Sequence, residues 1–425
     1  MPSDLAAVVM AAGLGTRMRS ATPKHLHSLL GRRMVDWVLE AATPLGPDPL
    51  VVVTSPDTAD AYPGLEVAVQ AEPRGTGDAV HAARGSVEGR AGDVLVLSGD
   101  TPLLTTGLLE NLLETHRREG AAATVLSFSP TDPHEYGRIV RAGNGSLAAI
   151  VEARDASPEQ LAIREVNSSI YVFRNDALWP ALDRLDAANS QGELYLTDTI
   201  RLLAEAGEPV AVHEAPDPVE AEGVNTRAEL AAASEALRDR LNLAHMLAGV
   251  TIVDPSSTWI EPDVEIETDV TIHPFTVIRG DVRIASGAEI GPFAYVRPGT
   301  ALADGVKIGT FVEVKNTTVG RGARIPHLSY IGDADVGEGA NVAASNVTAN
   351  FDHRPGEPKK RTRIGRNVRT AVDNTFVAPV EIGDDAWLAA GAVITEDVPP
   401  GSLAGFPPRQ VTKEGYVYEK HGKRD

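Results

Sequence analysis

Aliphatic residues at a spacing of six constrain the fold of the C-terminal half more than any other feature of the sequence. Ten of them follow one another as Ile260, Ile266, Ile272, Ile278, Ile284, Ile290, Val296, Leu302, Ile308 and Val314, and the register returns at Ile364, Phe376, Ile382, Leu388 and Ile394. A helix repeats after about 3.6 residues and a strand after about 2, so neither gives this period. Flat turns that each add one aliphatic residue per face stack into a parallel β-helix. We therefore predict a parallel β-helix over residues 250–401.

Before residue 250 the sequence has a different pattern, in which apolar runs and amphipathic runs alternate. The apolar runs are short and end in small or polar residues, at 6–13, 49–55, 93–100 and 122–129. Helical patterns such as "MVDWVLEAAT" and "LLENLLETHRR" lie between them. This alternation predicts an α/β domain with a mostly parallel sheet that is covered on both faces. Ligands of such a sheet bind at the carboxyl ends of its strands.

A single long helical pattern, rich in Ala, Leu, Arg and Glu, connects these two regions. A chain of 425 residues is also too long for one hydrophobic core. We expect an α/β domain at 1–224, a helical arm at 225–249, the β-helix at 250–401 and a C-terminal tail at 402–425.

The charge and composition limit the partners of this chain. Its formal net charge of −20 disfavours binding to nucleic acid or to an anionic membrane, because both attract positive surfaces. The absence of Cys excludes disulfides and thiolate metal sites and fits a reducing compartment. No basic segment followed by an apolar run begins the chain, and no apolar run reaches membrane-spanning length. We expect a cytoplasmic protein with small-molecule partners.

The stretch "VVMAAGLGTRMRSATPKHLH" places a Gly-Leu-Gly turn directly after the first predicted strand. Backbone N–H groups in such a turn can face an anion. The turn differs from the dinucleotide-binding fingerprint because Met18 stands where the third glycine would be. Arg17 and Lys24 follow it and supply positive charge suited to a triphosphate.

The segments "AAGLGTRM" and "TPKHLH" are similar to the signature of sugar-1-phosphate nucleotidyltransferases. More narrowly, the chain resembles the family of bifunctional N-acetylglucosamine-1-phosphate uridylyltransferases and glucosamine-1-phosphate acetyltransferases over nearly its whole length. The resemblance implies that the β-helix is left-handed, that the protein is a homotrimer and that Mg²⁺ is required. It implies acetyl transfer from acetyl-CoA to glucosamine-1-phosphate, followed by uridylyl transfer from UTP to N-acetylglucosamine-1-phosphate with release of pyrophosphate.

The resemblance also implies a first active site in the α/β domain. Its nucleotide and sugar contacts would be Ala11, Ala12, Gly13, Leu14, Gln70, Gly75, Thr76, Ser98, Gly99, Gly137, Glu152 and Asn167. Arg17 and Lys24 would act on the phosphates, and Asp100 and Asn225 would be ligands of Mg²⁺, which prefers oxygen donors. The sugar phosphate attacks the α-phosphorus in line, so catalysis requires positioning and charge neutralisation rather than a covalent intermediate.

A second active site is implied on the β-helix. Its acceptor-binding residues would be Arg297, Lys315, Tyr330, Asn341 and Lys359. His327 would deprotonate the attacking amine, and a neutral imidazole with a pKa near about 6.5 suits that role. Glu313 matches a carboxylate that would orient the histidine.

The acetyl-CoA side of this second site departs from the family pattern. The positions that align with the family's acetyl-CoA contacts are Ala344, Asn350, Phe351, Val372 and Ala390, and Ala344 and Ala390 carry the family's residue. Among the departures, Ala343 replaces a glycine, Phe351 a tyrosine, Val372 a serine and Pro407 an arginine.

Three hypotheses therefore stay open. The first is a bifunctional enzyme. The second is a uridylyltransferase whose β-helix is a trimer scaffold or acts on another acyl donor or sugar. The third is a non-catalytic regulatory subunit, against which the retained Asp100, Asn225, Arg17 and Lys24 argue.

Overall fold

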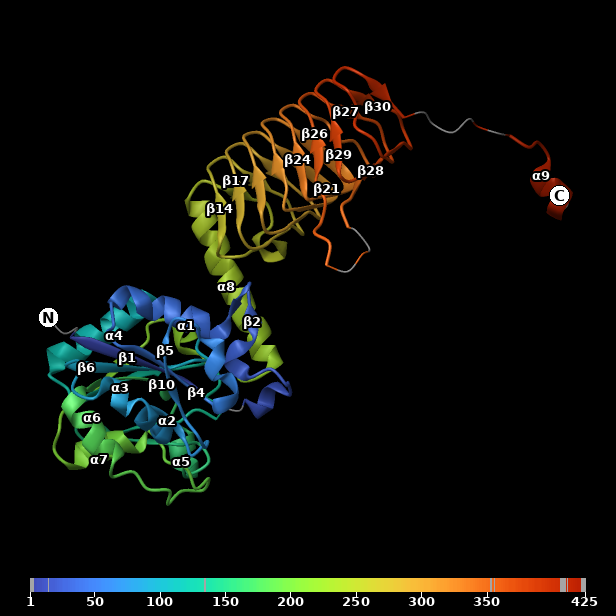
Figure 1. The fold of residues 1–425 in the computed structure, drawn as a ribbon. Helices are drawn as coiled ribbons and strands as arrows, with labels where there is room; N and C mark the ends of the chain where they lie inside the picture. Colours follow the sequence, from blue (N-terminus) through green and yellow to red (C-terminus); the bar gives the residue numbers. More distant parts are fainter. Residues whose placement is uncertain are drawn as a thin grey trace. The chain divides into compact units, whose positions relative to one another are not determined.

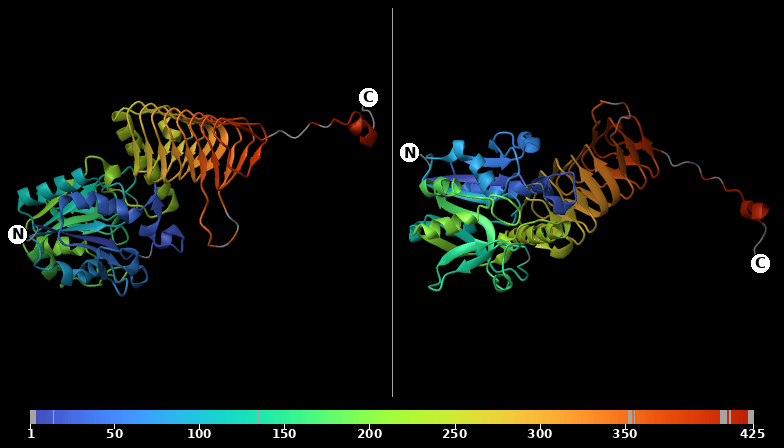
Figure 2. Two further views of the ribbon diagram at one scale, coloured as in Figure 1. Left: turned by 45° about the horizontal axis from the view of Figure 1, so that its top comes forward. Right: turned by 90° about the horizontal axis from the view of Figure 1, so that it is seen from below.

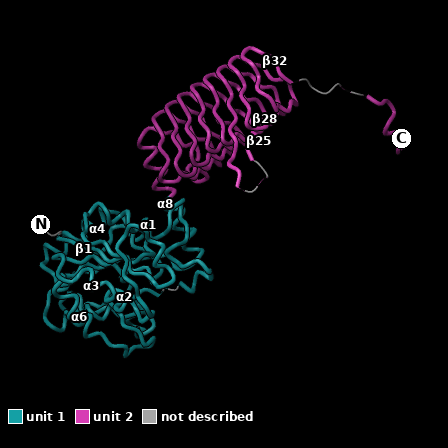
Figure 3. The backbone as a smooth tube through the Cα atoms, viewed as in Figure 1, with its two compact units in different colours: residues 1–237 teal, residues 238–425 magenta. Residues whose placement is uncertain are grey.

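The computed structural model describes residues 4–13, 15–133, 135–351, 354, 356–405, 410 and 412–421. The chain divides into two compact units, residues 1–237 and 238–425 (Figure 3). The division falls inside α8 (Arg227–Leu247), the helix that occupies the expected arm. Within the described ranges, no helix has the length and apolar character needed to cross a membrane.

The first unit is built on a nine-stranded sheet whose main path runs β11-β7-β10-β6-β1-β4-β5. The bounds along this path are Val210–Glu214, Ala123–Phe128, Val166–Arg174, Asp93–Ser98, Leu5–Ala11, Leu50–Thr54 and Glu66–Val69. Neighbours on the path are parallel, except that β10 runs antiparallel to β6 and β7. The strands β8 (Arg138–Arg141) and β9 (Leu147–Val151) extend the sheet beside β10. The predicted mostly parallel sheet is confirmed, with β1, β4, β6 and β7 at the four apolar runs.

Helices cover both faces of this sheet (Figures 1 and 2). They are α1 (Met34–Ala42), α2 (Thr76–Ala82), α3 (Arg84–Val87), α4 (Thr106–Glu119), α5 (Pro158–Leu161), α6 (Asn175–Leu182) and α7 (Asp198–Glu205). Successive side chains of a strand point to opposite faces, so β1 contributes Ala6 and Val8 to one core and Ala7 and Val9 to the other. The first core includes residues of α2, α6 and α7, and the second includes residues of α1 and α4. This burial explains why β1 is apolar throughout rather than alternating.

The second unit is a left-handed β-helix with three faces of parallel strands. The first face contains β12 (Thr251–Ile252), β15 (Thr271–Ile272), β18 (Glu289–Ile290), the first halves of β21 (Lys307–Lys315) and β23 (Arg324–Gly332), β27 (Arg369–Thr370), β30 (Trp387–Leu388) and β32 (Leu403–Ala404). The second face contains β13 (Trp259–Ile260), β16 (Val277–Ile278), β19 (Tyr295–Val296), the second halves of β21 and β23, β25 (Val347–Ala349), β28 (Thr375–Val377) and β31 (Val393–Ile394). The third face contains β14 (Val264–Ile266), β17 (Val282–Ile284), β20 (Thr300–Leu302), β22 (Thr318–Val319), β24 (Ala334–Val336), β26 (Thr362–Ile364) and β29 (Val380–Ile382).

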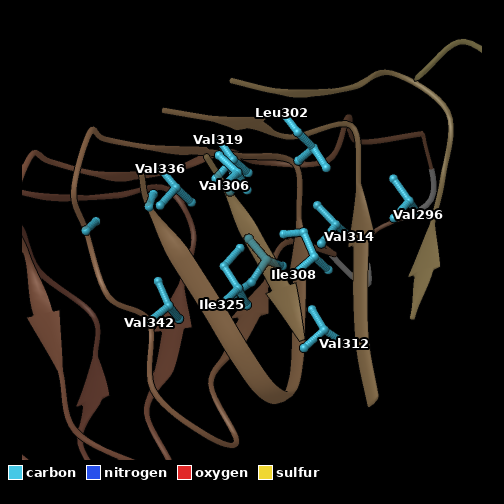
Figure 4. Packing of buried hydrophobic residues seen from close by; sticks show 14 of the residues in the cluster. Val296, Leu302, Val306, Ile308, Val312, Val314, Val319, Ile325, Val336 and Val342 are labelled. Carbon is cyan, nitrogen blue, oxygen red and sulfur yellow. The ribbon is translucent and has the colours of Figure 1, made fainter. Parts of the chain in front are cut away.

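The aliphatic repeat lines the interior of this β-helix, as predicted. Every predicted member is buried in one core, except Ile266, which is partly buried against it. Figure 4 shows Val296, Ile308 and Val314 among the side chains of this core. The spacing of six is lost after Val314 because the next turns are shorter by one residue, as the pairing of Val314 with Ile331 shows.

The C-terminal half of α8 packs on the first turn of the β-helix. The Asn242 side-chain amide donates to the carbonyl oxygens of Pro255 at 3.0 Å and Thr258 at 2.9 Å. Arg238 donates to Ser256 O at 2.9 Å, and its guanidinium lies 4.9 Å from the centre of the Trp259 ring. These contacts fix the end of α8 to the start of the stack.

Candidate active sites

A cavity of about 1040 Å³ lies in the first unit, where β1 and β6 end. Fifteen of the sixteen residues predicted for the first site line it: Ala11, Ala12, Gly13, Arg17, Lys24, Gln70, Gly75, Thr76, Ser98, Gly99, Asp100, Gly137, Glu152, Asn167 and Asn225. Leu14, the sixteenth, lies outside the described residues. Residues from distant parts of the sequence thus meet at the carboxyl ends of parallel strands, where ligands of such sheets bind.

The turn after β1 brings Lys24 close to the floor of the cavity. Gly15 has a φ of +58°, and a Cβ atom there would lie 2.5 Å from the Cβ of Lys24. A larger residue would therefore be strained and would also push Lys24 away. The glycine of this turn is required by the packing of Lys24 as well as by the turn itself.

The ammonium of Lys24 lies between two oxygen atoms that accept its hydrogen bonds. It hydrogen-bonds Asp100 Oδ2 and, at 2.9 Å, Asn225 Oδ1. Burial raises the pKa of Asp100, but the charge and hydrogen bond of Lys24 outweigh it, so the pKa of this carboxyl is lowered. An ionised carboxylate and an amide oxygen therefore converge on one cationic atom.

Arg17 is held at the rim of the cavity by weaker contacts. It donates to Glu135 at 2.6 Å and to Asn225 Oδ1 at 2.9 Å. The Arg17 and Glu135 side chains are both about half exposed, at 52% and 60%. Ion pairs this exposed contribute little free energy, so Arg17 can exchange Glu135 for the phosphates of a ligand.

Buried polar groups line the other end of the cavity. Glu152 accepts a hydrogen bond from Thr197 at 3.1 Å, and its burial raises its pKa. Asn167 donates to the Tyr171 hydroxyl at 2.7 Å. A Cβ atom on Gly137 would lie 3.6 Å from both carboxylate oxygens of Glu152. Such fixed donors and acceptors around an open space suit the hydroxyl groups of a sugar.

Two residues that were not predicted, Tyr136 and Asp78, contact the residues of this site. The Tyr136 hydroxyl accepts a hydrogen bond from the Gly223 N–H at 3.0 Å, and burial raises its pKa to about 12. Asp78 accepts a hydrogen bond from Gln70 at 2.9 Å. Both lie beside predicted residues, Tyr136 in "EYGRIV" and Asp78 in "GTGDAV", so their position in these motifs is the signal that the sequence offers.

His25 makes the stability of the first unit depend on pH. It is 4% exposed, and burial lowers its pKa from 6.5 to about 4. Because the unfolded chain then binds more protons between these values, stability is full above pH 6.5 and falls as the pH drops towards 4. We expect His25→Gln to reduce this loss of unfolding free energy by up to about 3 kcal/mol. Urea unfolding of the wild-type protein and the variant from pH 7.5 to 4 measures this difference. Parallel plots of unfolding free energy against pH would contradict the expectation.

His327 of the second predicted site lies at a corner of the β-helix. It pairs with Thr310 of the preceding turn, between the first and second faces. Arg297 and Lys315 lie on the second face in successive turns. The close approach of Lys359 lowers the pKa of Lys315, as like charges do. Three cations therefore gather on this face, where a phosphate would relieve their repulsion.

The carboxylate of Glu313 contacts Arg297 rather than His327. Its carboxylate accepts a hydrogen bond from Arg297 at 2.6 Å, and its strand position pairs with Tyr330 rather than with His327. Among the described residues, the imidazole of His327 has no hydrogen-bond partner, and the residue is exposed. The contact with Arg297 gives no support to the expectation that Glu313 orients the histidine, which stays a prediction.

The residues predicted for the coenzyme follow His327 along the same corner. The Asp373 N–H donates to Ala344 O at 3.1 Å and the Gly391 N–H donates to Val372 O at 2.9 Å. Ala344, Val372 and Ala390 therefore occupy one corner in successive turns. Val372 is 43% exposed there.

The two neighbouring positions predicted for the coenzyme differ from each other. Asn350 is buried and donates to Asp333 and, at 3.3 Å, to the Tyr330 hydroxyl. Phe351 is 64% exposed. Pro407 lies outside the described residues.

Asn341 is not brought together with the other acceptor residues in one chain. It pairs with Arg324 and Arg369 on the first face, whereas Arg297, Lys315 and Tyr330 belong to the second face. One chain alone therefore leaves Asn341 apart from the cations.

Comparisons with known proteins match both units. Residues 7–188 match the model of the MobA-like NTP transferase domain, and residues 263–297 match that of the bacterial transferase hexapeptide repeat. The chain is 44% identical over 464 residues to the bifunctional protein GlmU of Mycobacterium tuberculosis (strain ATCC 25177 / H37Ra), covering 99% of this chain and 93% of the relative. It is 45% identical over 457 residues to the bifunctional protein GlmU of Streptomyces coelicolor, covering 98% and 94%.

Proposed function

The chain belongs to the GlmU family of bifunctional proteins, and on this premise we propose where its two reactions take place and which residues perform them. The protein is a bifunctional enzyme that makes UDP-N-acetylglucosamine by acetyl transfer and then uridylyl transfer. The observation that carries the site assignment is the convergence of Lys24, Asp100 and Asn225 in the cavity of the first unit.

Uridylyl transfer takes place in this cavity. The base of UTP lies at Gln70, the triphosphate at Arg17 and Lys24, and N-acetylglucosamine-1-phosphate at the end with Glu152 and Asn167. A phosphate oxygen of the sugar forms a bond to the α-phosphorus as the bond to the pyrophosphate oxygen breaks. Arg17 and Lys24 neutralise the charge that develops on the phosphates.

Asp100 and Asn225 fit Mg²⁺. Both present oxygen atoms, and both already contact one positive atom, the Lys24 ammonium. Few protein oxygens suit a cation that takes its remaining ligands from water and phosphates. When bound, Mg²⁺ would neutralise triphosphate charge, while Lys24 turns from these oxygens to the phosphates.

Acetyl transfer takes place at the corner that holds His327. Arg297, Lys315 and Lys359 bind the phosphate of glucosamine-1-phosphate, supported by the charge arrangement on the second face. His327 removes a proton from the amine as its nitrogen attacks the thioester carbonyl, and coenzyme A leaves as the thiol. Acetyl-CoA lies along the corner at Ala344, Val372 and Ala390.

A homotrimer built from packed β-helices is supported by an exposed apolar column beside His327. The rings of Phe275 and Phe293 are 4.7 Å apart and those of Phe293 and Phe311 are 5.1 Å apart, each ring residue being about half exposed. Leu328 continues this column and is 58% exposed. A second copy that covers the column would also supply Asn341 from its first face.

Substituting the middle of this column tests the assembly. Phe293→Asp should convert a particle of three chains to single chains, because the column loses its apolar surface. The backbone tolerates the change, since Asp269, Asp373 and Asp385 adopt the same positive φ at other corners. Analytical ultracentrifugation measures the mass, with Val253→Asp as a control at another exposed apolar position. A variant that keeps the mass of three chains contradicts the assignment of this surface.

Two assays on the wild-type protein test the pair of reactions. Pyrophosphate release from UTP should require both N-acetylglucosamine-1-phosphate and Mg²⁺. Thiol release from acetyl-CoA should require glucosamine-1-phosphate. Absence of thiol release, even at millimolar acetyl-CoA, would leave the uridylyltransferase alone. The small-molecule substrates and the absence of Cys support a cytoplasmic location.

A further inference from the structure

Gln70 presents only one side of its amide group to the cavity. The residue follows β5, lines the cavity and is 7% exposed. Its Nε2 donates to Gly75 O at 3.0 Å and to Asp78 Oδ2 at 2.9 Å. A carbonyl and a carboxylate only accept hydrogen bonds, so the amide nitrogen must face both of them. The opposite orientation would bring three acceptor oxygens together.

The acceptor oxygen of Gly75 has a fixed position. The Gly77 N–H donates to Leu194 O at 2.8 Å, and the Leu194 N–H donates to Arg74 O at 2.8 Å. Gly75 has a φ of +114°, and a Cβ atom there would lie 2.5 Å from Leu194 O. The segment that carries this carbonyl is therefore hydrogen-bonded to the backbone of Leu194 both before and after Gly75.

Asp78 is held almost as firmly. It lies in the first turn of α2 and its side chain is 15% exposed. Arg74 pairs with its Oδ1 at 3.1 Å, which leaves Oδ2 for Gln70. The carboxylate is thus fixed by a helix and an arginine before it bonds the amide.

The consequence for a ligand is a single exposed acceptor. Among the described residues, no group donates a hydrogen bond to Gln70 Oε1, so this oxygen remains for the bound base. Uracil carries an N–H at ring position N3 and can donate to it. Cytosine carries a lone pair at N3 and would place two acceptors against each other.

We propose that Asp78 determines the choice of uracil over cytosine, by holding the Gln70 amide with Oε1 towards the base. This inference rests on the proposed placement of the nucleotide in the cavity. Asp78 is a positioning residue because it acts through Gln70. A site that leaves a buried polar group unpaired rejects the wrong ligand strongly.

Nucleotide selectivity tests the proposal. The measured quantity is kcat/KM for UTP divided by kcat/KM for CTP, with N-acetylglucosamine-1-phosphate as acceptor. Asp78→Ala should lower this ratio at least about tenfold, because the amide can then turn its nitrogen towards the base. Asp78→Glu keeps a carboxylate and should stay within about threefold of wild type. Asp183→Ala is the matched control: Asp183 also pairs with an arginine, Arg84, at 2.8 Å, but its partners Arg84 and His81 do not line the cavity, whereas Gln70, the partner of Asp78, does.

Other outcomes separate this inference from the proposed function. A ratio within twofold of wild type in folded Asp78→Ala overturns the inference. Equal losses with UTP and CTP do the same, because they indicate a structural role alone. If Asp78→Ala unfolds at a lower temperature than the wild-type protein, the same ratio is measured in Asp78→Leu, which keeps a side chain of similar size. Wild-type protein that releases no pyrophosphate from UTP refutes the proposed function, and the inference falls with it.

Discussion

Replacing Asp100 by alanine is expected to lower pyrophosphate release from UTP by at least about a hundredfold. The change removes one of the two oxygens that converge on the Lys24 ammonium, and it removes the only charged one. Steady-state turnover with saturating UTP and N-acetylglucosamine-1-phosphate measures the loss. Acetyl transfer should remain at the wild-type rate because it takes place in the other unit.

A control at the other end of the same strand separates chemistry from folding. Asp93 begins β6, its side chain is 17% exposed, and it pairs with Arg117 at 3.2 Å. Asp93→Ala therefore removes a similar ion pair outside the cavity, and folded protein should retain its turnover. Near-normal uridylyl transfer in Asp100→Ala would exclude this carboxylate from the mechanism.

The second large effect is expected at the other active site. His327→Ala should lower acetyl transfer by about 10²–10⁴-fold, the usual contribution of a general base. Uridylyl transfer should be unchanged because the two units have separate cores. Thiol release from acetyl-CoA in the presence of glucosamine-1-phosphate measures the loss.

His273 offers a matched control on the same β-helix. Its imidazole contacts Glu289 at 3.0 Å and is partly exposed, so His273→Ala removes a surface histidine of the same unit. That variant should keep full acetyl transfer. If His327→Ala retained acetyl transfer, another group would have to accept the proton of the amine.

The fold could be predicted wherever burial imposes a pattern on the sequence. The interior of the β-helix admits one aliphatic residue per face, which produces the spacing of six as far as Val314. The pattern then fails because Val314 pairs with Ile331, one residue early, and because Val336 pairs with Ile364, 28 residues later. The reversed direction of β10 has no local signal either, since most of its residues are buried, as those of the parallel strands β1 and β6 are.

The first site could be predicted from its motifs, but the contacts between motifs could not. Asp78 and Gln70 are separated by a turn, and only the folded loop shows that one fixes the other. Tyr136 and Gly223 are far apart in sequence and meet through the Tyr136 hydroxyl, which hydrogen-bonds the backbone of Gly223. The contact of Glu313 with Arg297 could not be predicted for the same reason, because Arg297 comes from the preceding turn.

The contact between α8 and the β-helix also bears on the end of the stack at which the first strands lie. Within the part of the chain that the structure describes, the first strands β12, β13 and β14 each pair with the strand one turn later and with no other strand, so their other edges are open. Such edges are templates on which a second stack can grow into a fibre. Asn242 and Arg238 occupy carbonyl oxygens of Pro255, Ser256 and Thr258 at this end. The C-terminal half of α8, whose Met246 packs against the core of the β-helix, therefore covers part of this end and leaves less of it open to a second stack.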